Sequence, residues 1–186
     1  VTGVQTCALP ILDVATGAPR YGNTQQGYAD DSCWSRGQAW GIYGFLLSYI
    51  YTGDETMIAL SKRLANYFLN RLPEDYVCHW DLALVGTDAL RDSSSAAIAV
   101  CGLLELVKHL PVTDPDRERY LEWAKGIMSS LTKHYLMGKE EKGNGLLKHS
   151  VYHLASNKGV DECASWGDYF YVEALVRFTQ SWKLYW

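Results

Sequence analysis

The sequence predicts an all-α fold built as a two-layer toroid of helices, and two observations support this prediction. Segments that are apolar on nearly all sides alternate along the chain with segments that are apolar on one face, as the inner and outer helices of a toroid would. The period-two alternation that marks half-buried strands is scarce. A solenoid of helical hairpins would show the same alternation, although the repeats are too dissimilar to indicate a known solenoid family.

The first pair of helices is predicted at residues 35–51 and 54–71. The earlier segment is apolar all round, and we expect Asp31 or Ser32 to cap its start. The later segment is amphipathic and begins after a short turn that ends in the capping residue Asp54. Three glycines in the earlier segment have spacing that would let a neighbouring backbone approach closely, and these are Gly37, Gly41 and Gly44.

The same pattern recurs further along the chain. A buried helix rich in small residues is predicted at 96–107, with Asp92 as a cap. An amphipathic helix should start at Thr113-Asp114-Pro115, with proline in its first turn, and reach about residue 135. Residues 138–158 indicate a long loop with room for short strands. A third buried helix, rich in aromatic residues, is predicted at 164–178.

Composition limits the classes of function. The chain has 186 residues and a formal net charge of −4, with scattered basic residues, so neither a nucleic-acid-binding stripe nor a polybasic membrane patch is indicated. The apolar runs are too short and too interrupted to span a bilayer. Seven Trp and thirteen Tyr residues suit either a large core or a site that stacks sugar rings. We therefore expect no nucleic-acid or membrane partner, while the oligomeric state stays open.

The first eleven residues, VTGVQTCALPI, look like the in-frame translation of a common sequencing adapter. An ordinary N-terminal loop is the alternative, but an eleven-residue match by chance is improbable. We treat residues 1–11 as non-native and exclude them from the fold. We then expect the natural N-terminus to be missing, which leaves the compartment open between a bacterial cytoplasm and periplasm.

The cysteines do not indicate a zinc site or a disulfide framework. Cys7 falls in the excluded segment, and the other four have no C-x-x-C spacing. Cys101 lies in an apolar helix and is predicted to be a buried thiol. These four are Cys33, Cys78, Cys101 and Cys163.

The segment most informative about chemistry is 26–44, which reads QGYADDSCWSRGQAWGIYG. It places Arg36 in the first turn of a buried helix and Trp40 one turn later on the same face. A guanidinium can grip a carboxylate with two hydrogen bonds, and a Trp ring can stack on a pyranose, so the pair suits an anionic sugar. The alternative is structural, with Arg36 paired to Asp30 or Asp31 and Trp40 in the core.

Three segments carry a resemblance to a known family. They are WSRGQAWG at 34–41, RDSSSAA at 91–97 and GDYFYVEAL at 167–175. They resemble the unsaturated glucuronyl hydrolases, glycoside hydrolase family 88, and the resemblance runs through residues 12–186. The related rhamnogalacturonyl hydrolases tend to carry GRGNGW at the first position, so this chain favours the glucuronyl branch.

The resemblance implies an (α/α)6 barrel of twelve helices, of which this chain would supply roughly half as the C-terminal part of one catalytic domain. It also implies removal of a 4,5-unsaturated uronic acid from the non-reducing end of lyase-generated oligosaccharides. In that reaction an Asp protonates C4 and assists attack of water at C5, which is general acid–base chemistry rather than displacement at the anomeric carbon. The catalytic Asp residues would lie in the missing half, so we expect no catalytic residue, metal or cofactor here and no turnover by this chain alone.

What the resemblance carries over to this chain is substrate binding. Gln26, Arg36 and Trp40 match the family's contacts to the unsaturated uronate. Trp34 is a weaker candidate, because helical spacing would turn it away from Arg36. The stretch 153–158 resembles a Ser-x-x-Ser-x-Lys loop that holds the adjacent amino sugar of sulfated disaccharides. Its expected contacts are His153, which replaces the first Ser, Ser156 and Lys158.

Other polar residues receive structural interpretations. Asp54 and Asp92 are expected to cap helices rather than to catalyse. His149 and His153 have the i, i+4 spacing of a metal pair but lie in a predicted loop without a third ligand. Two alternative functions stay open, namely a rhamnogalacturonyl hydrolase and a non-catalytic helical-repeat binding module.

Overall fold

The computed structural model describes residues 9–184, and five α-helices dominate it. They are α1 (Ser35–Thr52), α2 (Glu55–Leu69), α3 (Ser93–His109), α4 (Pro115–Ser130) and α5 (Ser165–Thr179). Each lies where the sequence predicted a helix, within a few residues at either end. Residues 1–8 of the segment assigned to the adapter lie outside the described residues.

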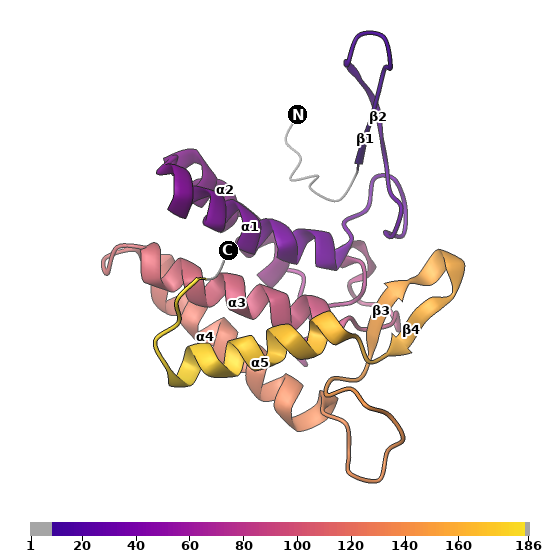
Figure 1. The fold of residues 1–186 in the computed structure, drawn as a ribbon, viewed down its shortest axis with the longest axis vertical. Coiled ribbons are helices and arrows are strands. Elements are labelled where there is room, and N and C mark those ends of the chain that lie inside the picture. The colour runs from indigo at the N-terminus through magenta and orange to yellow at the C-terminus, as the bar shows by residue number, and fades with distance from the viewer. Residues whose placement is uncertain (1–8, 185–186) are drawn as a thin grey trace.

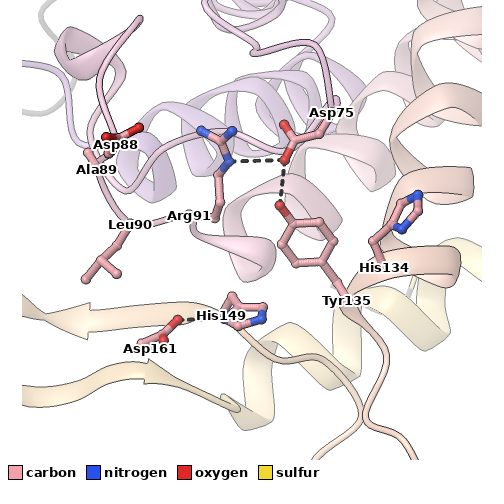
Figure 2. A pocket seen from close by; sticks show the side chains of 9 residues that line it. All are labelled: Asp75, Asp88, Ala89, Leu90, Arg91, His134, Tyr135, His149 and Asp161. Carbon is pink, nitrogen blue, oxygen red and sulfur yellow. Dashed lines mark hydrogen bonds and ion pairs between the residues drawn. The ribbon is translucent and has the colours of Figure 1, made fainter.

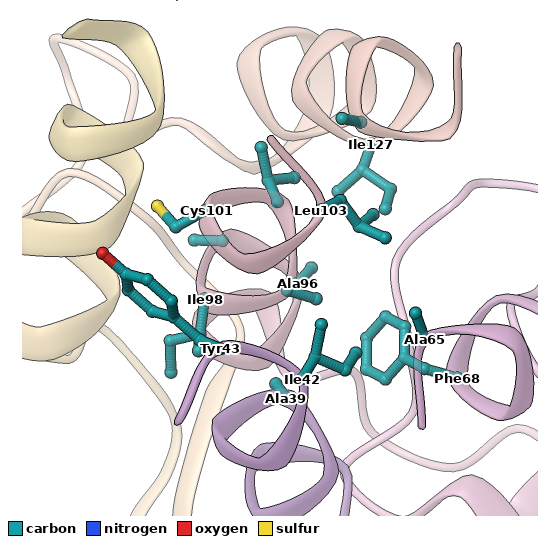
Figure 3. Close-up of a cluster of buried hydrophobic side chains, with 14 of the residues drawn as sticks. Ala39, Ile42, Tyr43, Ala65, Phe68, Ala96, Ile98, Cys101, Leu103 and Ile127 are labelled. Carbon is teal, nitrogen blue, oxygen red and sulfur yellow. The ribbon is translucent and has the colours of Figure 1, made fainter. Parts of the chain in front are cut away.

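The helices form two layers, as expected for part of an α/α barrel. Helix α3 packs against α1 and α5 in one layer, while α2 packs on α1 and α4 packs on α3 (Figure 1). The core between the layers contains Ile42, Phe68, Ile98 and Ile127, all fully buried (Figure 3). The three helices predicted to be buried are therefore the inner layer, and the two amphipathic helices are the outer one.

Burial of the inner helices differs from the prediction in one respect. Fourteen of the seventeen residues of α3 are buried, whereas α1 and α5 each leave one face open. Trp40 on α1 is 39% exposed, and Tyr169, Val172 and Leu175 on α5 are 44%, 45% and 41% exposed. Helices α1 and α5 flank α3, so each has an inner neighbour on one side in the described chain.

Close helix packing depends on glycine, but mainly at a position other than the predicted stripe. A Cβ at Gly102 of α3 would lie 2.8 Å from Ile42 Cγ2 and 3.2 Å from the Tyr43 backbone nitrogen, so α1 and α3 approach closely there. A Cβ at Gly41 would meet the Leu64 side chain at 2.8 Å, and one at Gly44 would meet nothing within 4 Å. Among the described residues, a side chain rather than a backbone approaches Gly41, and nothing approaches Gly44 on the open face of α1.

Helix starts confirm the expected caps Asp54 and Asp92, add Asp114 as a third, and correct the prediction for α1. Asp54, Asp92 and Asp114 each accept a hydrogen bond from a backbone N–H of the first turn they precede. Helix α1 starts after Trp34 without a side-chain cap, so the prediction of Asp31 or Ser32 is wrong. Ser32 instead donates to the buried Asp81 carboxylate at 2.6 Å.

Two small antiparallel hairpins complete the described fold. The pair β1 (Leu9–Leu12) and β2 (Pro19–Asn23) was not predicted, and β3 (Ser150–His153) with β4 (Lys158–Glu162) falls partly within the predicted loop. Short 3-10 turns occupy Leu82–Leu84 and Leu154–Ser156, and a π-helical turn, Leu131–Tyr135, extends α4. No helix among residues 9–184 is long and apolar enough to cross a membrane.

Candidate substrate site

Trp34 and Arg36, two of the residues predicted to bind substrate, lie at the start of one inner helix and close to the starts of the other two. Arg36 is in the first turn of α1, Asp92 caps α3, and Trp166 is in the first turn of α5. The hairpin β3–β4 stands beside these helix starts (Figure 1). Helix N-termini carry partial positive charge and unpaired N–H groups, so this end of the inner layer suits an anionic ligand.

Arg36 is the centre of this cluster and is 3% exposed. Its guanidinium forms an ion pair with Asp92 at 2.9 Å, so the expected partners Asp30 and Asp31 are wrong. It also donates to the carbonyl oxygens of Val151 at 2.8 Å and Tyr152 at 3.0 Å. Burial lowers the pKa of Arg36, and the Asp92 carboxylate opposes that shift. The guanidinium thereby joins α1, α3 and β3.

Aromatic rings enclose the Arg36 guanidinium. Its central carbon lies 4.6 Å from the ring centroid of Trp34 and 5.2 Å from that of Trp166, distances at which a cation is attracted to an aromatic face. The expectation that Trp34 points away from Arg36 is wrong, because Trp34 precedes the helix and does not have helical backbone angles. The Trp166 indole also donates to Ser94 Oγ at 3.1 Å, and its ring lies 5.5 Å from that of Tyr152.

Gln26 converges on the same hairpin from a separate segment. Its side-chain amide donates to the Tyr152 carbonyl at 2.7 Å, the oxygen that Arg36 also binds. The loop between Gln26 and α1 is ordered by Asp81, which accepts hydrogen bonds from Tyr28 N at 2.9 Å and Cys33 N at 3.2 Å. The sequence pattern did not single out Asp81, because its partners lie about fifty residues away.

Trp40 lies apart from the Arg36 cluster. Its ring contacts Phe170 of α5 edge-to-face, with centroids 5.0 Å apart, and it remains 39% exposed. It is therefore not a core residue, and the rings that enclose the guanidinium are those of Trp34 and Trp166 instead. An exposed Trp face of this kind can still stack on a sugar ring.

The three remaining predicted residues lie at the end of the hairpin. His153 Nδ1 accepts from Ser156 N at 3.1 Å and lies 2.9 Å from Ser156 Oγ. The imidazole therefore caps the turn Leu154–Ser156. Ser156 and Lys158 are exposed, and Lys158 pairs with His153 across the hairpin. Ser156 and Lys158 thus share one tip, with His153 ordering it.

A second polar cluster lines a cavity of about 570 Å³ on the outer side of the hairpin (Figure 2). Arg91 binds Asp75 at 3.1 Å, and Tyr135 donates to the same carboxylate at 2.7 Å. His149 and Asp161 lie 2.7 Å apart on the facing wall. Burial raises the pKa of Tyr135, and the Asp75 carboxylate adds to the shift. The sequence analysis did not predict this cluster.

Metal-ligating side chains do not gather in the part of the chain that the structure describes. Within residues 9–184, no group of three or more His, Cys, Asp or Glu side chains is arranged to hold a metal ion. Cys33, Cys78 and Cys101 are buried cysteines outside any disulfide, and Cys163 is partly buried. Burial raises the pKa of Cys101, which confirms its predicted place in the core and keeps it protonated.

Comparison with known proteins places this geometry in context. No protein-family model matches the chain. The unsaturated chondroitin disaccharide hydrolase of Streptococcus pneumoniae is 51% identical over 94% of the chain and 44% of its own length. The unsaturated glucuronyl hydrolase of Bacillus sp. strain GL1 is 39% identical over 94% of the chain and 47% of its own length. The chain therefore spans about half the length of these relatives.

A solved structure has the same fold over that half. The unsaturated glucuronyl hydrolase of Streptococcus agalactiae, complexed with dGlcA-GalNAc6S, has 50% sequence identity and a TM-score of 0.85. The match covers 94% of this chain and 47% of that one. The two-layer arrangement of the five helices therefore corresponds to about half of a known α/α barrel.

Proposed function

Since the chain is homologous over nearly its whole length to the unsaturated glucuronyl hydrolases, we propose that it is the C-terminal part of an enzyme of that activity. The parent protein, meaning the complete protein to which residues 12–186 belong, removes a 4,5-unsaturated uronic acid from lyase-generated oligosaccharides. It does so by hydration of the C4=C5 bond, with the acid/base Asp outside this chain. The observation that carries the proposal is the convergence of Gln26 and Arg36 on β3.

The domain assignment belongs to the same proposal. Residues 12–186 supply part of a single (α/α)6 domain, and residues 1–11 are foreign to it. Pairing of Leu9–Leu12 with β2 is compatible with a foreign segment, because strand ladders use backbone groups that every sequence offers. Strand β2 is exposed throughout. A neighbouring strand can therefore pair with its backbone whatever side chains that strand carries.

We propose that Arg36 contributes to uronate binding mainly by its position, because it fixes the Val151 and Tyr152 carbonyls of β3 beside the helix starts. Asp92 neutralises the buried guanidinium, while Trp34 and Trp166 restrict its orientation. Gln26 adds a polar side chain beside the same hairpin, and Trp40 offers an exposed ring to the sugar.

The adjacent amino sugar would bind at the hairpin tip. The Ser156 hydroxyl is within hydrogen-bonding distance of His153 Nδ1, which occupies both side chains. Lys158 is exposed and is the cationic donor that a sulfate at the tip would meet. The S. agalactiae enzyme is complexed with a disaccharide named dGlcA-GalNAc6S. We therefore propose unsaturated chondroitin-type disaccharides as the substrate class, with Lys158 contributing most of any preference for sulfate.

The direct test measures loss of the ultraviolet absorbance of the unsaturated uronate. The parent protein should consume unsaturated chondroitin disaccharides, and this chain alone should not. Turnover by the chain alone would contradict the assignment of the acid/base to the other half. Turnover of unsaturated rhamnogalacturonan disaccharides, with none of the chondroitin type, would replace the proposed substrate.

A second measurement addresses Lys158. In the parent protein, Lys158→Ala should raise the KM for a sulfated disaccharide about threefold to tenfold, because one charge-assisted hydrogen bond is lost. The KM for the unsulfated disaccharide should change little. Lys142→Ala, on another exposed loop, is the matched control. Equal effects of Lys158→Ala on both disaccharides would contradict sulfate recognition at the tip.

A further inference from the structure

The hairpin β3–β4 is fastened differently on its two strands. Strand β3 is held by Arg36, which binds the carbonyl oxygens of Val151 and Tyr152. Strand β4 is mostly exposed, yet it carries Lys158 and follows the turn that contains Ser156. A tip that binds sugar needs both strands fixed, so a contact that anchors β4 would control how well the tip is positioned.

His149 and Asp161 provide such a contact at the base of the hairpin. His149 Nδ1 and Asp161 Oδ1 lie 2.7 Å apart, and Figure 2 shows the two side chains meeting across the base of the strands. His149 is itself tied to the body of the fold. Its carbonyl accepts from Ser93 N of α3 at 3.1 Å, and its ring lies edge-to-face on Tyr135 at 5.7 Å.

Both residues adopt a backbone conformation that normally favours glycine. The φ angle is 65° at His149 and 59° at Asp161, in the left-handed region where side chains are disfavoured. Asp161 is the extra residue of a bulge, because Ser150 pairs with Glu162 and Val151 pairs with Val160. Bulges redirect side chains, and this one turns Asp161 toward His149. Two costly conformations that bring two side chains together indicate a use for the side chains themselves.

We infer that the His149–Asp161 pair is a clasp that positions the substrate-binding tip of the hairpin. The pair anchors β4 through His149 to α3 and to the π-helical turn Leu131–Tyr135, while Arg36 anchors β3 to α1. Ser156 and Lys158 are then held between two fixed strands. The inference rests on the proposed function, because it takes the tip as the site for the adjacent sugar. His149 and Asp161 are positioning residues and do not touch the substrate.

Substitution at Asp161 separates the clasp from the backbone conformation. Asp161→Gly keeps the left-handed conformation without cost and removes the bond to His149. Asp161→Asn tolerates that conformation and retains an acceptor oxygen. Glu162→Gln removes a negative charge from the same strand without altering the clasp. All three variants are made in the parent protein and assayed with a sulfated unsaturated disaccharide.

The glycine variant should raise KM about threefold to fivefold at unchanged kcat, the size expected for the loss of one exposed hydrogen bond. Asn at 161 should restore a KM near the parental value, and Glu162→Gln should leave KM unchanged. A parental KM in the glycine variant overturns the clasp. An asparagine variant as impaired as the glycine variant also overturns it, because charge near the site would then control KM.

Amide hydrogen exchange gives a readout that does not depend on turnover. Exchange across 158–162 should be faster in Asp161→Gly than in the parent protein and near parental in Asp161→Asn. Unchanged exchange in the glycine variant overturns the clasp even where the parent protein turns over substrate. Absence of turnover by the unmodified parent protein instead counts against the proposed function. In that case the hydrogen-exchange comparison alone tests the clasp.

Discussion

At the scale of single residues, Asp92 both pairs with Arg36 and caps α3. The two side chains are 4% and 0% exposed, and Asp92 also accepts hydrogen bonds from Ser94 N and Ser95 Oγ at 3.1 Å and 2.8 Å. Removing one member of a buried pair leaves an uncompensated charge. The Asp92 carboxylate therefore compensates the cost of burying the charge of Arg36.

We predict that Asp92→Ala lowers the free energy of unfolding of the parent protein by about 3–5 kcal/mol. The loss combines an unpaired guanidinium with an uncapped α3. Urea unfolding monitored by circular dichroism measures it. Asp54→Ala removes an exposed cap of the same geometry and is the control, with a much smaller loss expected. Equal losses in the two variants would show that Asp92 acts as a cap alone.

His79 gives a pH-dependent prediction. Burial lowers the pKa of His79, and the nearby Arg91 charge acts in the same direction, while the hydrogen bond to the Ala89 carbonyl opposes the shift. The unfolded chain then takes up this proton at a higher pH than the folded one. Stability from His79 is therefore present above about pH 6.5 and is lost as the pH falls below it.

The measurement compares urea midpoints at pH 7.5 and pH 5.5. The parent protein should lose stability on acidification, and His79→Gln should lose less, because glutamine does not titrate. His134→Gln is the control, since His134 lines the cavity beside Arg91, the residue that contacts His79. An identical pH dependence in the parent protein and His79→Gln would contradict the prediction.

The sequence predicted such residues by type and location but not by partner. Arg36, Gln26 and the caps Asp54 and Asp92 stand in recognisable local patterns. The ion pair of Arg36 with Asp92 spans 56 positions, and the bond of Gln26 to Tyr152 spans 126. Such contacts depend on how α1, α3 and β3 are brought together, which local patterns do not encode.

At the scale of elements, helical periodicity was a sufficient guide to the five helices, and turn chemistry was a poor one to the hairpins. The hairpin β3–β4 turns through Asn157 in the left-handed region, and its bulge places Asp161 where glycine is usual. The two strands are only four and five residues long, too short for an apolar alternation that would predict them. The clasp between His149 and Asp161 was likewise hidden, because its residues belong to no periodic pattern.

The contact between α1 and α3 yields the third prediction. Gly102→Ala should destabilise the parent protein by about 1–3 kcal/mol, since a methyl group there meets Ile42 and the Tyr43 backbone. That loss exceeds the gain of about 1 kcal/mol in helix propensity. A methyl group at Gly41 meets only the end of the Leu64 side chain, at 2.8 Å, so Gly41→Ala should cost less. Thermal unfolding checks both, and equal shifts would contradict close packing at Gly102.

At the scale of the whole molecule, the described helices form an inner layer with two open flanks. Helix α3 is surrounded, whereas α1 and α5 expose one face each. The open face of α5 borders a groove of about 420 Å³ lined by Tyr169, Val172 and Val176. Contiguous apolar surface of this kind is uncommon on soluble monomers, so the arrangement suits helices that have further neighbours in the parent barrel.

The last prediction concerns this chain when it is produced alone. It should aggregate or form a molten state, with dye binding to exposed apolar surface and no cooperative thermal transition. Val172→Lys replaces an apolar side chain on the open face of α5 and should reduce aggregation of the isolated chain. In the parent protein the same change should be destabilising, because a lysine would be buried between packed helices. Val112→Lys, at an 85% exposed position outside the helices, should change neither. A monodisperse chain with a cooperative transition would contradict the prediction, since it would mean that the open flanks need no partner.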